Sequence, residues 1–167
     1  IPAIQVRMST LLANRLSDFL NTEISIGRTD MGLLNRIILD DVLIMDQQQD
    51  TLLRAARLSA KLDLGAILKG KIVINNAQLF GCYVNIYQNN PKGKTNLQFL
   101  IDAFSSKDTT AQKDIDLRIN SVLVRRGEIR FNKYYIAETP GQFNPAHIHL
   151  KQLSTNIALK AFTKDSL

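Results

Sequence analysis

The sequence predicts a mainly β protein with an N-terminal α-helix, in which a curved, antiparallel sheet of repeats forms a groove, with one or two short extra helices. Two observations predict this class. Apolar residues recur at helical spacing early in the chain, and one spacing typical of bent strands recurs three times after it. With 167 residues, 45% hydrophobic and 22% charged, the chain suits one globular domain or a fragment of a longer repetitive protein.

The helix is predicted over residues 1–22, the first of two regions. Its apolar residues form one stripe, and its polar face is not rich in lysine or arginine. We therefore expect it to dock on a core rather than lie in a membrane interface, and to end at Asn21 or Thr22. The stripe consists of Ile4, Met8, Leu11, Leu12, Leu16, Phe19 and Leu20.

Residues 23–167 form the second region, a repeat sheet that begins with a strand at 23–27. Four apolar residues at offsets 0, 2, 5 and 7 occur there three times, and two of the copies continue at offsets 12 and 14. The copies are Ile37, Leu39, Val42 and Ile44; Ile72, Ile74, Ala77, Leu79, Val84 and Ile86; and Leu117, Ile119, Val122, Val124, Ile129 and Phe131. A weaker fourth copy starts with Ile148, Leu150 and Leu153.

The step of three residues inside each copy predicts a β-bulge. A strand presents one face at every second residue, so a step of three reverses the face unless a bulge absorbs one residue and bends the strand. Each copy is therefore predicted to be a long, bent strand pair with one aliphatic face. Gly81 and Gly127 mark either a tight turn or a second bend. The residues inside the steps are polar: Asp40 and Asp41, Asn75 and Asn76, Asn120 and Ser121.

Polar turns and short helices are predicted between the copies. Residues 46–50 form a polar turn that leads into another strand, and 89–94 form a loop. Short helices are expected at 64–70 and 96–104, and a last strand at 147–162.

Patterns of catalytic and metal-binding residues are incomplete, so no enzyme, metal site or cofactor is predicted. His147 and His149 share one face of a strand, but no third ligand lies nearby. Cys82 has no basic neighbour that would activate it and is expected to be an inert core thiol. Gly93-Lys94-Thr95 resembles the end of a phosphate loop, but Gln88 stands where that motif needs glycine. The aspartates fall at predicted bends and turns.

The net charge of +6 predicts a solvated basic surface. The 21 lysines and arginines are scattered, and no basic stretch is interleaved with the aromatic residues that would stack on bases. We expect no nucleic-acid partner. Attraction to an anionic membrane or to a protein partner is the alternative.

Several motifs, in order, resemble the region after the inner-membrane anchor in TamB-like proteins of the translocation and assembly module, within the AsmA-like group. The order of helix, strand and bent strand is also similar to the start of chorein-type bridge lipid-transfer proteins. The motifs are Ile1-Pro2-Ala3-Ile4-Gln5, Asn35-Arg36-Ile37-Ile38-Leu39-Asp40-Asp41, Asp46-Gln47-Gln48-Gln49-Asp50, Lys71-Ile72-Val73-Ile74 and Leu79-Phe80-Gly81.

The resemblance implies a periplasmic protein, anchored to the inner membrane of a Gram-negative bacterium through a segment upstream of this chain. It implies a long β-groove that moves phospholipid between the inner and outer membranes or assists outer-membrane protein assembly. It also implies an outer-membrane assembly partner, which the family engages through a C-terminal region that this chain lacks.

Two functions remain open from the residues. The repeated aliphatic face is expected to line a groove for phospholipid acyl chains, or else to form the closed core of a structural or interaction module that uses a free sheet edge. The groove candidates are Ile37, Leu39, Val42, Ile44, Leu58, Leu62, Ile72, Ile74, Leu79, Val84, Ile86, Leu117, Ile119, Val122, Val124, Ile129 and Phe131.

Overall fold

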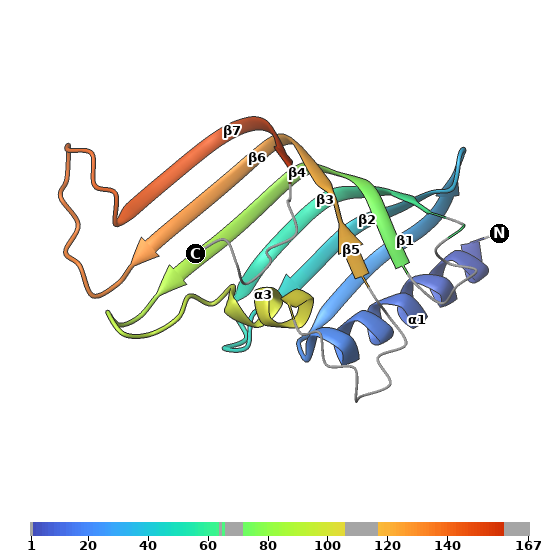
Figure 1. Ribbon diagram of the computed structural model, residues 1–167, viewed down its shortest axis with the longest axis horizontal. Helices are drawn as coiled ribbons and strands as arrows, with labels where there is room; N and C mark the ends of the chain where they lie inside the picture. The colour runs from blue at the N-terminus through green and yellow to red at the C-terminus, as the bar shows by residue number, and fades with distance from the viewer. Residues whose placement is uncertain (1, 64, 66–71, 106–116, 159–167) are drawn as a thin grey trace.

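The computed structural model describes residues 2–63, 65, 72–105 and 117–158 (Figure 1). It confirms the predicted class: a mainly β chain with an N-terminal helix, a sheet not closed into a barrel and a short extra helix. The predicted helix at 64–70 lies almost entirely outside the described residues. The elements are α1 (Pro2–Leu20), β1 (Ile24–Gly32), β2 (Arg36–Met45), β3 (Thr51–Leu62), β4 (Ile72–Gln88), α3 (Gln98–Ser105), β5 (Leu117–Ile119), β6 (Ser121–Lys133) and β7 (His147–Ala158).

The sheet is mixed, which corrects the prediction of a purely antiparallel one. Its order is β1-β2-β3-β4-β6-β7, and the short β5 pairs with the start of β4. Neighbours are antiparallel except that β4 is parallel to β5 and β6. The physical reason is the long connection after β4, which includes α3 and returns the chain to the end of the sheet where β4 begins.

The second and third sequence copies lie side by side in register. Ile72 pairs with Leu117, and the same separation of 45 residues holds along the strands, as in the pair Ile86 and Phe131. Equivalent positions of the repeat therefore neighbour each other across the sheet. Because partners in register share a face, their apolar residues lie on one side.

The bulges predicted in these two copies are present. The pairing of β3 with β4 steps from Asn76 to Ile74 and skips Asn75. At the equivalent place in the next copy, Asn120 interrupts the strand between β5 and β6, and its backbone N–H donates to the carbonyl of Ile74 at 3.1 Å. The side chains of Asn120 and Asn75 are also hydrogen-bonded, at 3.2 Å.

A second row of bends crosses the sheet. Three residues that lie level with one another in three strands have positive φ: Asp41 (54°), Gly81 (59°) and Arg126 (52°). In β7 the residue with positive φ is Gln152 (54°), which lies between Leu150 and Leu153, the partners of Ile129 and Gly127. The bend that the sequence indicated at Gly81 is therefore a kink within one continuous strand and not a turn, and in β6 the kinked residue is Arg126. In Figure 1 the strands arch at this level, and both helices lie beneath the arch.

The alignment of the first copy with the second was wrong. Leu39 pairs with Leu58, which in turn pairs with Leu79, so the first copy is level with 77–84 and not with 72–79. The reason is that β4 contains two bulges, and each produces the same apolar spacing. The spacing alone does not distinguish them.

We expect Gly81→Val to lower the free energy of unfolding by about 2 kcal/mol, because a β-branched residue is strained at positive φ. An added Cβ would also lie 3.3 Å from that of Ala56. Chemical denaturation measures the loss. Gly141→Val is the matched control, since Gly141 also has positive φ but has no atom within 4 Å of an added Cβ. An equal loss in both variants would show that packing at the kink contributes nothing.

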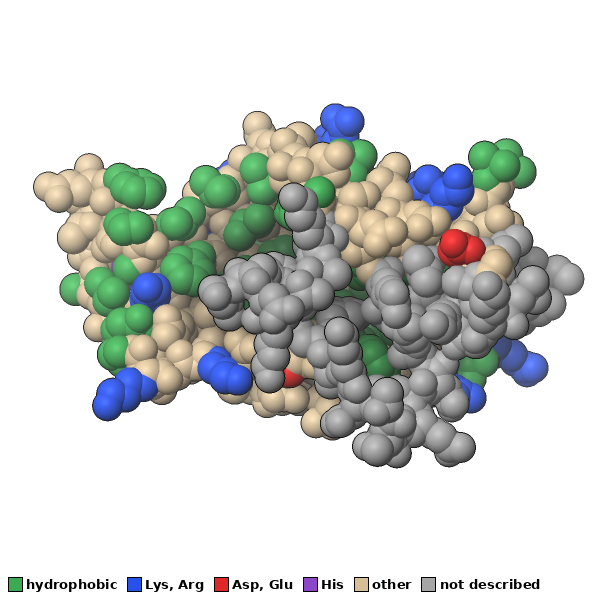
Figure 2. Space-filling view, viewed as in Figure 1, with side chains coloured by type: hydrophobic (Ala, Val, Ile, Leu, Met, Phe, Trp, Pro, Cys, Tyr) green, Lys and Arg blue, Asp and Glu red, His purple; other side chains and the backbone are tan. Residues whose placement is uncertain are grey.

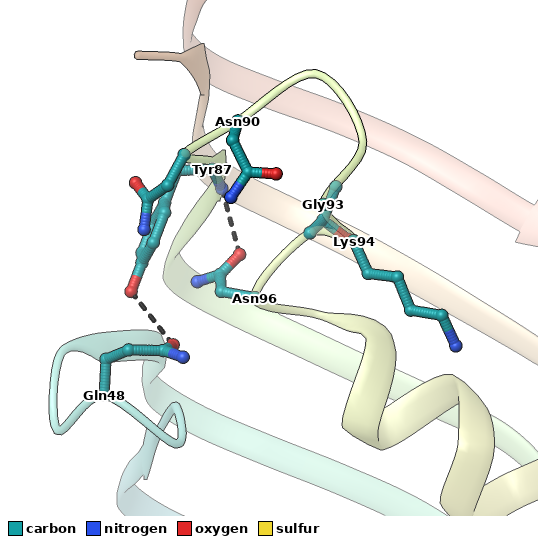
Figure 3. Close-up of a pocket in the computed structure, with 8 residues that line it drawn as sticks. Gln48, Tyr87, Asn90, Gly93, Lys94 and Asn96 are labelled. Carbon is teal, nitrogen blue, oxygen red and sulfur yellow. Dashed lines mark hydrogen bonds between the residues drawn. The ribbon is translucent and has the colours of Figure 1, made fainter. Parts of the chain in front are cut away.

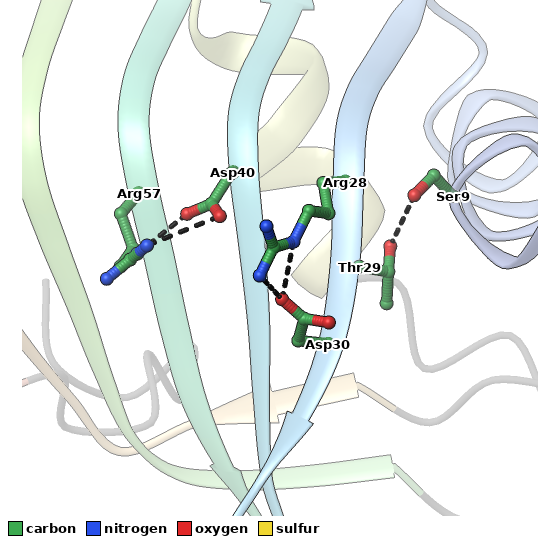
Figure 4. Close-up of polar contacts among 6 residues, drawn as sticks. All are labelled: Ser9, Arg28, Thr29, Asp30, Asp40 and Arg57. Carbon is green, nitrogen blue, oxygen red and sulfur yellow. Dashed lines mark hydrogen bonds and ion pairs between the residues drawn. The ribbon is translucent and has the colours of Figure 1, made fainter. Parts of the chain in front are cut away.

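Helix α1 packs on the concave face of the sheet beside β1. The buried hydroxyl of Ser9 donates to Thr29 Oγ1 at 2.9 Å (Figure 4), and the backbone N–H of Ile24 donates to Ser17 Oγ at 3.0 Å. The helix ends at Leu20 and is followed by Asn21 at φ 50°, as the sequence indicated. No helix among the described residues combines the length and hydropathy needed to cross a membrane.

The convex face carries charged and aromatic side chains. Arg57 forms two hydrogen bonds with Asp40, the shorter 2.6 Å, and Arg28 pairs with Asp30 (Figure 4). The hydrogen bonds and charge of Arg57 hold the pKa of Asp40 below its ordinary value, against a smaller opposing effect of burial. The guanidinium of Arg126 lies 5.3 Å from the ring centre of Phe80.

Candidate functional site

The concave face is built of apolar rows that run across the strands. One row crosses all six long strands, and each member pairs with the next in register. Since one end of the row packs against α1, the pleat places the whole row on the concave side. The row is Ile24, Ile44, Leu53, Val84, Ile129 and Leu150.

The groove candidates divide into two groups on this face. Leu39, Val42 and Val124 are buried in one core cluster that also contains α1 residues Ala13 and Leu20. Residues of α3 pack against this cluster, and so do five more candidates from the strands. These candidates are Ile37, Ile44, Leu58, Leu79 and Val122. Seven others are half-buried and are not among the described residues that pack there: Leu62, Ile74, Val84, Ile86, Ile119, Ile129 and Phe131. The side chains of Ile72 and Leu117 lie outside the described residues.

Burial falls along the row from β1 to β7. Ile24 is buried beneath α1, Val84 and Ile129 are half-buried, and Leu150 on β7 is 47% exposed. A second row of three residues runs parallel to it: Ile86 pairs with Phe131, which pairs with Ile148. We name the six residues of β4, β6 and β7 in these two rows the apolar strip: Val84, Ile86, Ile129, Phe131, Ile148 and Leu150.

Figure 2 is consistent with this gradient. Hydrophobic side chains gather in the left half of the view, over the region where Figure 1 draws β4, β6 and β7, and the surface between them is hollowed. Lysine and arginine side chains stand mainly at its rim. The apolar strip thus offers a surface of aliphatic and aromatic groups with charges around it.

Strand β7 ends the sheet on this side. It pairs with β6 alone among the described strands, so its outer edge presents backbone groups to which another strand can add. Its apolar residues follow the spacing of the fourth, weaker copy, with the kink at Gln152 between Leu150 and Leu153. Leu150 and Ile148 were visible in that spacing but were not among the groove candidates.

A small polar cavity of about 240 Å³ lies where β4 ends (Figure 3). It is lined by Tyr87, Gln48 and the loop with Gly93 and Lys94. In Figure 3 the Lys94 side chain points away from Tyr87, and its Nζ lies 3.9 Å from Asp102. The loop is closed by its own hydrogen bonds, among them that from the backbone N–H of Gly93 to the carbonyl of Asn90 at 3.1 Å.

Beside this cavity, Asp46 joins two loops to the end of β4. Its carboxylate is 0% exposed and accepts hydrogen bonds from Tyr87 Oη (2.7 Å) and Asn96 Nδ2 (3.0 Å), and from two backbone N–H groups at 2.9 Å. Burial alone would raise the pKa of Asp46, but these hydrogen bonds together lower it below its ordinary value. Burial and the nearby Asp46 raise the pKa of Tyr87. The sequence revealed the turn but not this long-range contact.

The two histidines and the cysteine take part in ordinary contacts. His147 lies near Asn132 and the carbonyl of Ile136, and His149 Nε2 lies 2.6 Å from Glu128. Cys82 is buried in the core cluster, and burial raises the pKa of its thiol. In the described part of the chain, no group of three or more potential ligand residues is placed to hold a metal ion.

Comparison with protein-family models, with curated proteins and with solved structures finds no match for this chain. The TamB-like resemblance therefore stays a prediction.

Proposed function

We propose that this chain is a non-catalytic envelope module whose apolar strip holds phospholipid acyl chains. In this proposal it is the periplasmic portion of a membrane-anchored, TamB-like protein that moves phospholipid between the inner and outer membranes or assists outer-membrane protein assembly. The observation that carries the proposal is the row from Ile24 to Leu150, which begins in a packed core and ends exposed on the same face.

The chemistry of the apolar strip suits a hydrocarbon chain. Each CH₂ removed from water contributes about 0.8 kcal/mol, and an acyl chain needs no specific polar partner for this gain. Repeated aliphatic positions in register also offer neighbouring sites of similar energy, between which a chain can slide. The charged convex face lacks these properties, because its aromatic rings lie against guanidinium groups.

The closed-core alternative applies to the half of the concave face beneath the helices. Leu39 and Val124 are buried there in the cluster that also contains residues of α1, as in any domain core. The free edge of β7 favours, as a second candidate function, a module that adds a strand from a partner. Acyl-chain binding and strand addition use different groups of β7, side chains in one case and backbone in the other.

Leu150→Asp is expected to abolish retention of phospholipid while the chain stays folded. A charge on the apolar strip is poorly compatible with hydrocarbon, and at 47% exposure the substitution costs less than about 1 kcal/mol of stability. Native mass spectrometry of the purified protein after incubation with phospholipid vesicles measures retained lipid. Phe80→Asp is the matched control, since Phe80 is 44% exposed on the opposite face.

The proposal predicts bound lipid in the wild-type protein and in Phe80→Asp, and none in Leu150→Asp. Equal lipid in all three proteins, or lipid in none of them, contradicts acyl-chain binding by the apolar strip.

A further inference from the structure

An exposed apolar tip stands at the turn between β1 and β2. Leu33 is 90% exposed and Leu34 is 80% exposed, and Met31 beside them is also exposed. Leu34 has φ 58°, a conformation that leucine rarely adopts and that glycine or asparagine adopts readily. A leucine that is both exposed and unfavourable for the turn does not serve folding, so it suggests a contact outside the chain.

The N-terminal end of α1 lies at the same end of the molecule. Ser17 contacts Ile24 and Ser9 contacts Thr29, so the helix runs antiparallel to β1 and its first turn points toward the tip. Figure 1 shows the N-terminus and the β1–β2 turn together at the right. Met8, which is exposed on this half of the helix, adds to the apolar surface.

The described charges around the tip are mainly basic. Three acidic residues lie at this end: Asp30, which pairs with Arg28, Asp40, which pairs with Arg57, and Asp63, which follows the end of β3. The basic residues there are Arg7, Arg28, Arg36, Arg57 and Lys61, so the balance of these eight is +2. In Figure 2 lysine or arginine side chains stand next to the hydrophobic group at the upper right, where Figure 1 draws the turn.

We propose that the β1–β2 turn inserts Leu33 and Leu34 into the surface of an anionic phospholipid bilayer. Exposed leucines flanked by lysine and arginine match a surface with negative headgroups above hydrocarbon. Insertion also explains why leucine stands at a position with positive φ, because asparagine or glycine there would offer no apolar side chain to the hydrocarbon. This inference does not depend on acyl-chain binding by the apolar strip.

The absence of tryptophan from the chain permits a direct test. A single tryptophan is introduced as Leu33→Trp, and in a second protein as Phe143→Trp. Phe143 is 85% exposed in the β6–β7 loop at the opposite end of the sheet, so it matches Leu33 in exposure. Each protein is mixed with phosphatidylcholine vesicles that contain about one third phosphatidylglycerol.

The expected result is a shift of tryptophan emission to shorter wavelength for Leu33→Trp and none for Phe143→Trp. Vesicle cosedimentation should be about tenfold weaker for the double variant Leu33→Ser, Leu34→Asn, because the variant lacks the two leucines that enter the bilayer. That variant suits the turn, so its thermal midpoint should not fall. Emission shifts in both tryptophan proteins, or in neither, overturn the proposal. A wild-type dimer without lipid that the double variant abolishes overturns it as well, since the tip would then contact a second copy.

These readouts are separate from the lipid-retention test. Leu150→Asp should leave the response of Leu33→Trp unchanged, and the tip variants should leave lipid retained on the apolar strip unchanged. Failure of one proposal is therefore distinguishable from failure of the other.

Discussion

Val124→Asp is expected to lower the free energy of unfolding by about 4 kcal/mol or more, enough to unfold many domains of this size. Val124 is 4% exposed and belongs to the core cluster, whose other members include Ala55 and Cys82. A carboxylate at this position would lose most of its water among the apolar members of the cluster. Urea denaturation followed by circular dichroism measures the change.

Leu150→Asp is the control for this variant, because both residues lie on the concave face. Its expected cost is several times smaller, since Leu150 remains in contact with water. Similar losses in both variants would mean that the apolar strip is as closed as the core cluster, and would favour the closed-core alternative.

Asp46→Ala is expected to cost about 3–5 kcal/mol. The substitution removes a carboxylate that accepts four hydrogen bonds. The buried donors Tyr87 Oη and Asn96 Nδ2 then lose this acceptor. The loops at 46–50 and 89–96 should separate from the end of β4. Thermal denaturation measures the stability, and hydrogen exchange of the Tyr87 amide, which donates to Asn96, reports the local opening.

The contribution of Asp46 should also depend on pH. Its folded-state pKa lies below the ordinary value of 3.8, so the stabilisation is fully present above that value and is lost as the pH falls through the folded-state pKa. The difference in stability between wild type and Asp46→Asn should therefore shrink below about pH 3.8. A difference that is constant down to acid unfolding would contradict the assignment of Asp46 as an ionised acceptor.

The sequence predicted the repeat well because its apolar spacing reports local geometry. Offsets of 0, 2, 5 and 7 require a bulge wherever they occur, and bulges or kinks are found at Asn75, Asn120 and Asp41. The same locality explains the misaligned first copy, since the bulges at Asn75 and Gly81 produce identical spacing.

Contacts between residues far apart in the chain could not be predicted, because apolar spacing reports only local geometry. An apolar stripe on α1 shows that a face is buried but not which strands it covers. Which groove candidates join the core cluster and which stay outside it was therefore not predictable. Leu11 belongs to that stripe and is exposed. The parallel pairing of β4 with β6 depends on the path of the connection, and the Asp46 contact joins residues far apart in the chain.

Photo-crosslinking with a phospholipid that carries a diazirine in its acyl chain tests most directly whether the concave face binds hydrocarbon. After irradiation, mass spectrometry identifies the labelled residues. We predict that labels concentrate on Ile129, Phe131, Ile148 and Leu150 and spare Phe80 and Tyr83. Labels spread equally over both faces, or confined to the convex face, would contradict the account.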